Sequence, residues 1–273
     1  MLVGVPKEIK NHEYRVGLTP AAVKEFVSNG HQVLVETLAG DAIGFSDDMY
    51  IAAGAAIAST AEQVFAEAEM IVKVKEPQPN ECKMLRKGQT LYTYLHLAPD
   101  PTQTELLIAS GATCIAYETV TDDRGGLPLL APMSEVAGRM SVQAGAHYLE
   151  KAHGGSGTLL GGVPGVAPGK VLVIGGGVVG TNAAKMALGL GADVTILDRS
   201  LPRLRQLDDI FNGQVKTVYS TVDAIEHYSA NADLVVGAVL IPGAAAPKLL
   251  NREQISAMKP GSVLVDVAID QGG

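Results

Sequence analysis

The sequence contains no tryptophan, and aromatic residues make up only 4% of its 273 residues. Hydrophobic residues nevertheless reach 47%, which is enough for a substantial core and argues against a disordered chain. Because aromatic side chains are scarce, that core must be built from valine, isoleucine, leucine and alanine. These residues suit parallel β-sheets that are covered by helices. The composition therefore favours an α/β fold.

Cysteine is also scarce. Cys82 and Cys114 are the only two cysteines, and their spacing matches neither a metal-ligand motif nor a disulfide framework. We expect both to be reduced thiols, as is usual in the cytoplasm. We predict no metal site from the sequence.

Positive charge and long apolar runs are missing as well. A formal net charge of −8 argues against nucleic acid or an anionic membrane surface as a partner. The charged N-terminal residues lack the apolar segment of a secretory signal. The most apolar late stretch, residues 234–250, is interrupted by two glycines and two prolines, which argues against a bilayer span. We expect a soluble, cytoplasmic protein.

The most specific motif lies in residues 171–198, VLVIGGGVVGTNAAKMALGLGADVTILD. A short apolar strand runs into Gly175-x-Gly177-x-x-Gly180, and a helical pattern and a second strand ending at Asp198 follow. In such a unit the first glycine permits a tight turn, and the second lets the backbone approach a pyrophosphate. The third lets the helix pack closely on the sheet, and the helix N-terminus faces the phosphates. We therefore predict a dinucleotide-binding site.

Asp198 favours NAD over NADP as the ligand of this site. A carboxylate after the second strand accepts hydrogen bonds from the adenosine ribose and repels a 2′-phosphate. The neighbouring Arg199 weakens this preference slightly. A glycine-rich turn alone is weak evidence, but here the strand, turn, helix, second strand and acid all follow in order.

Strand and helix patterns alternate on both sides of this unit. Further strands are predicted at residues 2–5, 31–37, 70–75, 90–96 and 113–118 before it, and at 214–219, 233–240 and 262–269 after it. This alternation predicts parallel sheets. A proline-bounded loop at residues 127–132 is the best boundary between domains. We expect a substrate domain with a parallel sheet over residues 1–130, and a Rossmann-type, doubly wound NAD-binding domain over residues 131–273.

Four polar side chains in the first half fall at the ends of predicted strands: Lys7, Lys75, His96 and Glu118. Ligands of open α/β sheets bind outside the carboxyl ends of the strands, where these groups should gather. Each has a simpler interpretation as well. Lys75 and Glu76 could form a solvated pair, and His96 could be a half-buried histidine without a catalytic role. Their coincidence at one edge favours a site.

Several long motifs resemble the alanine dehydrogenase and transhydrogenase NAD-binding family, and the L-alanine dehydrogenases in particular. They are VGVPKEIKNHEYRVGLTP, VKVKEPQ, YTYLHLA, APMSEVAGRMS, VLVIGGGVVG, ILDRS and VDVAIDQGG, and they extend over the whole chain. The resemblance implies an NAD-dependent enzyme that reversibly deaminates L-alanine to pyruvate and ammonium by direct hydride transfer. It also suggests a homohexamer.

The resemblance assigns roles to individual residues. Arg15 and Lys75 would bind the substrate carboxylate and carbonyl, and His96 would be the acid/base residue. Asp270, which follows the last predicted strand, would activate water or stabilise the imine. The implied cofactor contacts, beside the three glycines, are Ser134, Val178, Val179, Asp198, Arg203, Ser220, Val239, Leu240, Val267, Ala268, Ile269 and Asp270.

Members of this family continue for several tens of residues beyond the position of Gly273. We therefore expect the NAD-binding domain to be incomplete at its C-terminus, with consequences for the activity of this chain. Two alternatives stay open: the NAD-binding component of a proton-translocating transhydrogenase, and an NAD-binding fragment without catalysis. His96 favours the dehydrogenase, because a transhydrogenase moves no substrate proton.

Overall fold

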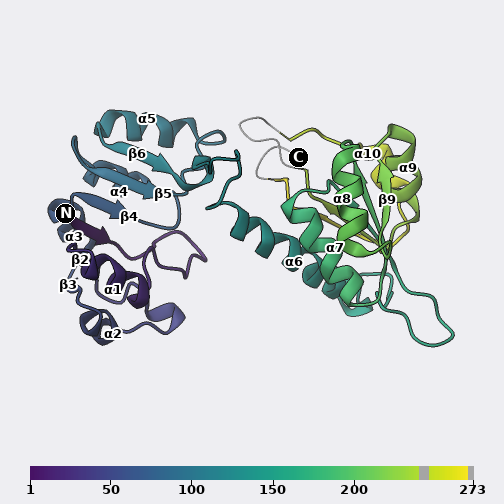
Figure 1. The fold of residues 1–273 in the computed structure, drawn as a ribbon, viewed down its shortest axis with the longest axis horizontal. Coiled ribbons are helices and arrows are strands. Elements are labelled where there is room, and N and C mark those ends of the chain that lie inside the picture. Colours follow the sequence, from purple (N-terminus) through teal and green to yellow (C-terminus); the bar gives the residue numbers. More distant parts are fainter. Residues whose placement is uncertain (240–245, 270–273) are drawn as a thin grey trace. The chain divides into compact units, whose positions relative to one another are not determined.

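The computed structural model describes residues 1–239 and 246–269 of the chain. The chain divides into two compact units, Met1–Leu130 and Ala131–Gly273. Each unit contains one parallel sheet with helices packed against it (Figure 1), so the predicted α/β fold with two parallel sheets is confirmed. None of the helices in the described residues is long and apolar enough to cross a membrane.

The first unit contains a six-stranded sheet in the order β3-β2-β1-β4-β5-β6. Its strands are β1 (Leu2–Val5), β2 (Gln32–Glu36), β3 (Ala56–Ala58), β4 (Met70–Val72), β5 (Thr90–Thr93) and β6 (Thr113–Ala116). The connecting helices are α1 (Pro20–Ser28), α2 (Asp47–Ala52), α3 (Ala61–Glu67), α4 (Pro79–Met84) and α5 (Pro101–Ser110). The strand order reverses between β1 and β4, and in open sheets this is where ligands bind.

Helices cover both faces of this sheet. Successive side chains of a strand point to opposite faces, so one strand contributes to the packing on both. On β2, Val33 and Val35 belong to a cluster with α1 and α2, whereas Leu34 packs with α3, α4 and α5. Helix α1 begins as the sequence predicts. The Thr19 hydroxyl accepts a hydrogen bond from the Ala22 N–H (3.3 Å), and a proline occupies the first turn.

The first sheet differs from the sequence-based expectation in two ways. Strand β3, with the short sequence Ala-Ile-Ala, was not predicted; it forms by parallel pairing with β2. Strands β4, β5 and β6 also end two or three residues earlier than predicted. Lys75, His96 and Glu118 therefore lie in the segments that follow the strands. Glu118 lies in the short 3-10 helix η2 (Tyr117–Thr119).

The second unit contains a five-stranded sheet in the order β11-β10-β7-β8-β9. Its strands are β7 (Lys170–Ile174), β8 (Asp193–Asp198), β9 (Lys216–Tyr219), β10 (Leu234–Gly237) and β11 (Val263–Asp266). Its helices are α6 (Ala131–Tyr148), α7 (Val178–Gly189), α8 (Leu201–Phe211), α9 (Val222–Asn231) and α10 (Arg252–Ser256). The strand order reverses between β7 and β10, as in a doubly wound nucleotide-binding sheet.

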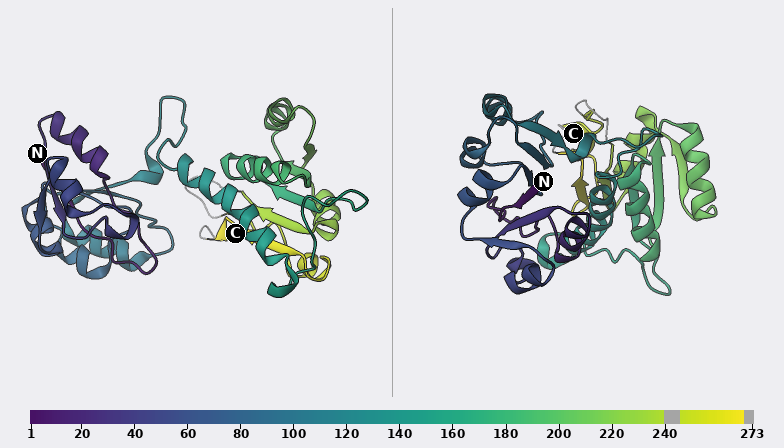
Figure 2. Two further views of the ribbon diagram at one scale, coloured as in Figure 1. Left: turned by 90° about the horizontal axis from the view of Figure 1, so that it is seen from below. Right: turned by 60° about the vertical axis from the view of Figure 1, so that its left-hand side comes forward.

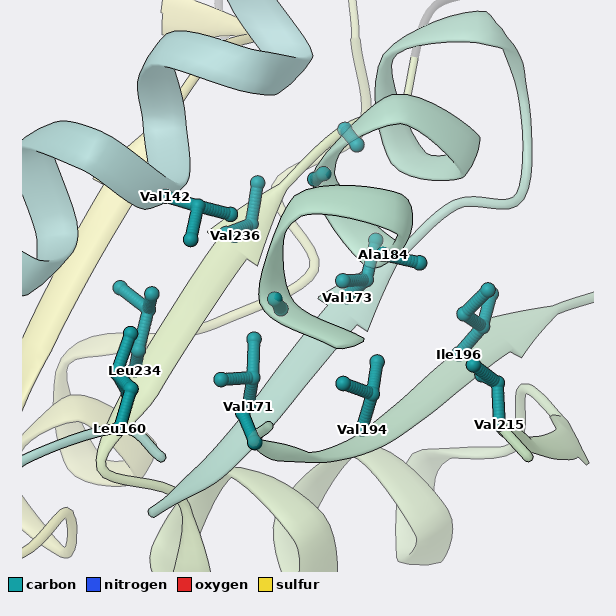
Figure 3. Packing of buried hydrophobic residues seen from close by; sticks show 14 of the residues in the cluster. Val142, Leu160, Val171, Val173, Ala184, Val194, Ile196, Val215, Leu234 and Val236 are labelled. Carbon is teal, nitrogen blue, oxygen red and sulfur yellow. The ribbon is translucent and has the colours of Figure 1, made fainter. Parts of the chain in front are cut away.

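Helices α6 and α7 lie side by side on one face of this sheet (Figure 2). Figure 3 shows Val142 of α6 beside Val236 of β10 in the apolar cluster beneath them. A Cβ atom on Gly138 would lie 2.2 Å from the Val179 carbonyl oxygen, and one on Gly145 would lie 2.5 Å from a Leu234 methyl group. The small residues of α6 thus permit close packing within this unit.

A buried ion triad lies beneath the carboxyl edge of the first sheet. Lys73, directly after β4, is 1% exposed, and its Nζ lies 2.9 Å from Glu8 Oε2 and 2.8 Å from Glu81 Oε1. The other oxygen of Glu8 accepts hydrogen bonds from the backbone N–H groups of Val74 (2.6 Å) and Lys75 (3.3 Å). The triad connects the loop after β1, the segment after β4 and helix α4.

Replacement of Lys73 tests this triad. Lys73→Ala should lower the free energy of unfolding by about 3–5 kcal/mol, because Glu8 and Glu81 would stay buried without a counter-charge. Lys83→Ala, at an exposed position of α4, is the control and should change it by less than about 0.5 kcal/mol. Urea unfolding followed by circular dichroism measures both. Equal losses in the two variants would contradict the stabilising role of the triad.

Candidate active site and dinucleotide site

The glycine turn between β7 and α7 has the geometry that a dinucleotide site requires. Gly175 has a φ of 104°, which only glycine adopts readily. A Cβ atom on Gly180 would lie 1.8 Å from the Gly175 carbonyl oxygen, so the helix can approach the turn only without a side chain there. A Cβ atom on Gly177 would meet no protein atom within 4 Å. That position is open and lies at the N-terminus of α7, where the backbone N–H groups of a helix can bind phosphate.

Asp198 and Arg203 lie against this turn. Asp198 ends β8, and its Oδ2 accepts a hydrogen bond from the Gly176 N–H (2.7 Å). Arg203 Nε donates to the Gly176 carbonyl oxygen (2.7 Å), and its Nη2 donates to Thr181 Oγ1 (2.8 Å). The carboxylate predicted to bind the ribose is therefore fixed beside the glycine turn.

Other predicted cofactor residues lie at the same carboxyl edge of the second sheet. The Ser220 N–H donates to the Asp198 carbonyl oxygen (3.0 Å), and the Val267 N–H donates to the Gly237 carbonyl oxygen (3.0 Å). Val239 follows β10 and approaches Gly175. The remaining members are Val178 and Val179 in the first turn of α7, Ser134 in the first turn of α6, and Ala268 and Ile269 after β11. The predicted residues Leu240 and Asp270 lie outside the described part of the chain.

In the first unit, neighbouring strands bring two predicted substrate-binding residues and the predicted acid/base histidine to one edge. Arg15 lies in the loop after β1. A Cβ atom on Gly17 would lie 2.4 Å from the Val72 carbonyl oxygen, so this loop packs against the end of β4. Lys75 follows β4, and its carbonyl oxygen accepts a hydrogen bond from the Thr93 hydroxyl (2.9 Å) at the end of β5. His96 follows β5 and is half-buried.

A carboxylate that the sequence did not single out holds Arg15. Arg15 Nε donates to Glu13 Oε1 (2.8 Å) and Nη2 donates to Glu13 Oε2 (2.6 Å), a bidentate pair. The hydrogen bond from Arg15 lowers the pKa of Glu13, and the charge of Lys75 adds a smaller lowering effect. Both cations therefore act on one carboxylate. The spacing of two residues between Glu13 and Arg15 is the signal that could have revealed the pair.

The backbone at His96 is in the left-handed region, with a φ of 54°. This conformation is uncommon for a residue other than glycine and needs support from its surroundings. Glu118 supplies it: Oε1 accepts hydrogen bonds from the N–H groups of His96 (2.7 Å) and Leu95 (3.1 Å). Glu118 thus fixes the segment that carries His96.

Lys75 and Lys7 both have partners within the first unit. Lys75 Nζ lies 3.6 Å from Glu76 Oε2, so the ion pair considered from the sequence is present, and Lys10 pairs with the same glutamate. The Lys7 N–H donates to Glu36 Oε2 (2.7 Å) at the end of β2. The backbone of Lys7 is therefore held toward β2, on the other side of β1 from Lys75.

Two family models match nearly the entire chain. "Alanine dehydrogenase/PNT, N-terminal domain" matches residues 4–137, and "Alanine dehydrogenase/PNT, C-terminal domain" matches residues 141–273. The chain belongs to the alanine dehydrogenase/PNT family. Membership in this family implies a nicotinamide nucleotide cofactor, which agrees with the space at Gly177 and the carboxylate of Asp198.

Individual relatives agree with this assignment. The chain is 64% identical over its full length to an alanine dehydrogenase of Halomonas elongata and covers 74% of that protein. A solved structure titled L-alanine dehydrogenase matches 99% of the chain at a TM-score of 0.94 and 54% identity, with 75% of that structure covered. A transhydrogenase from Sinorhizobium meliloti matches the whole chain at a TM-score of 0.85 and 29% identity, with 80% covered.

The glycine turn generates a test that separates binding from folding. Gly177→Ala should weaken NADH binding at least about tenfold, or about 1.4 kcal/mol, without lowering the melting temperature, because its methyl group meets only the ligand. Gly189→Ala is the matched control, since a Cβ atom there also meets no protein atom. It should leave NADH binding unchanged and should not lower the melting temperature, because alanine favours a helix more than glycine does.

Gly180→Ala should instead lower the melting temperature, because its methyl group meets the Gly175 carbonyl oxygen. NADH fluorescence and calorimetry measure the two quantities. NADH binding by Gly177→Ala as tight as that of Gly189→Ala would show that this turn does not hold the pyrophosphate.

Proposed function

We propose that this chain carries out the NAD-dependent, reversible oxidative deamination of L-alanine to pyruvate and ammonium. The observation that carries the proposal is the grouping of Arg15, Lys75 and His96 at one sheet edge, in a chain that also has the glycine turn of a nucleotide site. The 64% identity to a relative named alanine dehydrogenase supports the same reaction. Membership in the alanine dehydrogenase/PNT family also agrees with a small-molecule substrate.

The cations of the first unit suit the substrate carboxylate. The Arg15 guanidinium is planar, always charged, and held in place by Glu13. We assign it to the carboxylate shared by alanine and pyruvate. Lys75, whose backbone is held by Glu8, is assigned to the carbonyl oxygen of pyruvate. A compact ammonium suits a single oxygen, whereas a guanidinium suits two.

His96 is assigned the proton transfers. Oxidation of an amine to an imine needs a base that takes the ammonium proton, and hydrolysis of the imine needs a base for the attacking water. A histidine imidazole can accept and return a proton in both steps near neutral pH. Glu118 keeps the His96 segment in its left-handed conformation. Asp270 would assist with the water or the imine, as the family resemblance implies.

The predicted cofactor residues support NAD as the cofactor. The turn from Gly175 to Gly180 would hold the pyrophosphate, and Asp198 would accept hydrogen bonds from the adenosine ribose. When bound, the nicotinamide accepts the hydride from Cα of alanine. Arg203 donates to the Gly176 carbonyl, to Thr181 and to Gln206, so its guanidinium is engaged within the protein. Arg203 is therefore engaged elsewhere and does not serve as a partner for the 2′-phosphate of NADP. Asp198 would repel that phosphate, so both residues favour NAD.

The transhydrogenase component is the second candidate, and the match to the Sinorhizobium meliloti structure supports it. His96 argues against it, because transfer of a hydride between two nucleotides moves no substrate proton. Alanine-dependent NADH formation separates the two candidates. The homohexamer suggested by the family resemblance stays a prediction, which sedimentation velocity can test.

The decisive assay follows the absorbance of NADH with L-alanine, L-serine or glycine as substrate. It uses the 273-residue chain and a version extended by the C-terminal region of the Halomonas elongata relative. We expect NADH to form with L-alanine. Absence of alanine-dependent NADH in both proteins would refute the dehydrogenase proposal.

His96→Ala should lower turnover by roughly 10²–10⁴-fold, the usual contribution of acid–base catalysis, while NAD affinity stays unchanged. His227→Ala, at an exposed position of α9, is the control and should keep both turnover and affinity. Equilibrium binding and initial rates measure the pair of effects. A loss of NAD affinity in His96→Ala would show that His96 has been assigned the wrong role.

A further inference from the structure

Two histidines and a glutamate converge at the C-terminal end of α6. His147 lies in the last turn of the helix, Glu150 follows it, and His153 ends the short 3-10 helix η3 (Lys151–His153). Each side chain offers a nitrogen or carboxylate oxygen, and these three atoms all lie within 4.8 Å of one another. All three residues are exposed.

The chain reversal at Glu150 creates this cluster. In a continuous helix, residues six positions apart would be displaced by about 9 Å along the axis. Here Glu150 is extended, with φ −65° and ψ 142°, and the 3-10 turn that follows folds back. The ring centroids of His147 and His153 therefore lie only 3.8 Å apart.

Backbone contacts hold the turn in place. The N–H groups of His153 and Gly155 both donate to the Glu150 carbonyl oxygen, at 3.0 Å each. The Gly157 N–H donates to the Leu149 carbonyl oxygen (2.7 Å). A Cβ atom on Gly155 would lie 2.3 Å from the backbone of Leu149, so the turn packs directly on the helix end. The three side chains are thus presented from a fixed backbone.

The electrostatics of the cluster suit a cation. The Glu150 carboxylate lies beside both rings: Oε2 is 3.4 Å from His153 Nδ1, and Oε1 is 4.0 Å from His147 Nδ1. His153 Nδ1 also lies 3.2 Å from the His147 carbonyl oxygen. In the tautomer that donates to this carbonyl, Nε2 keeps its lone pair for a metal, as in many metal sites. The negative end of the helix dipole adds to the attraction.

We propose that His147, Glu150 and His153 bind one divalent transition-metal ion of the zinc class. Two imidazoles and a carboxylate are a ligand set that zinc uses where a coordination position stays open. His147 and Glu150 also line a groove of about 940 Å³, so water would complete the coordination. The sequence led us to predict no metal site, because the spacing becomes a ligand set only when the chain reverses at Glu150.

This site is separate from the nucleotide site. Ser134, near the other end of α6, lies about 20 Å away along the helix axis. Gly145 packs against Leu234, the first residue of β10, so this end of α6 lies at the amino edge of the sheet. The glycine turn lies at the carboxyl edge. The metal would join the end of α6 to η3 without contact with the nucleotide.

Equilibrium dialysis of the chelator-treated 273-residue chain against Zn²⁺ tests the proposal. We expect one bound equivalent, and affinity at least about tenfold weaker, or about 1.4 kcal/mol, in His147→Ala and in His153→Ala. Glu150→Gln should also weaken binding. His227→Ala, which removes an exposed histidine elsewhere, should bind zinc as the native chain does. Mg²⁺, which prefers oxygen ligands, should not compete.

Co²⁺ provides a readout of coordination that is independent of stability. The native chain should show visible d–d absorption, and the double variant His147→Ala/His153→Ala should lose it while its circular dichroism spectrum stays native. Two results would overturn the proposal. One is a native chain that binds no zinc at a large excess; the other is a double variant that binds zinc as tightly as the native chain.

Discussion

The carboxylate of Glu8 joins the core of the first unit to its candidate substrate site. One of its oxygens pairs with Lys73, which is buried, and the other accepts the N–H groups of Val74 and Lys75. Because a buried charge without a partner is costly, this arrangement tolerates little displacement. The segment after β4 must therefore leave the sheet on a fixed path, which carries Lys75 to the edge where Arg15 and His96 also lie.

The sheets of both units have one reversal of strand order, but different chemical groups lie beside it. In each sheet the strand order reverses once, between β1 and β4 in the first and between β7 and β10 in the second. Loops diverge at such a point, and ligands bind there. In the first unit, charged side chains and a histidine lie at this edge. The second leaves space at Gly177, where helix dipole and backbone N–H groups can meet phosphates.

The sequence was most informative where function depends on local backbone geometry. The backbone shape of the glycine turn and the place of Asp198 at the end of β8 could be predicted, because both depend on neighbouring residues in the chain. Strand β3 was missed because pairing with β2, not its own three residues, makes it a strand. The support of His96 by Glu118 and the cluster at His147 depend on contacts between separate segments or on a chain reversal, which periodicity does not reveal. Asp270, predicted from the family resemblance, lies outside the described residues.

We propose that the carboxyl edge beside β1, β4 and β5 binds the substrate. A crystal structure of the chain with NADH and pyruvate would show the location of the substrate. We expect the pyruvate carboxylate against the Arg15 guanidinium, and its carbonyl oxygen within hydrogen-bond distance of Lys75 or His96. Pyruvate bound away from these three residues would contradict the claim.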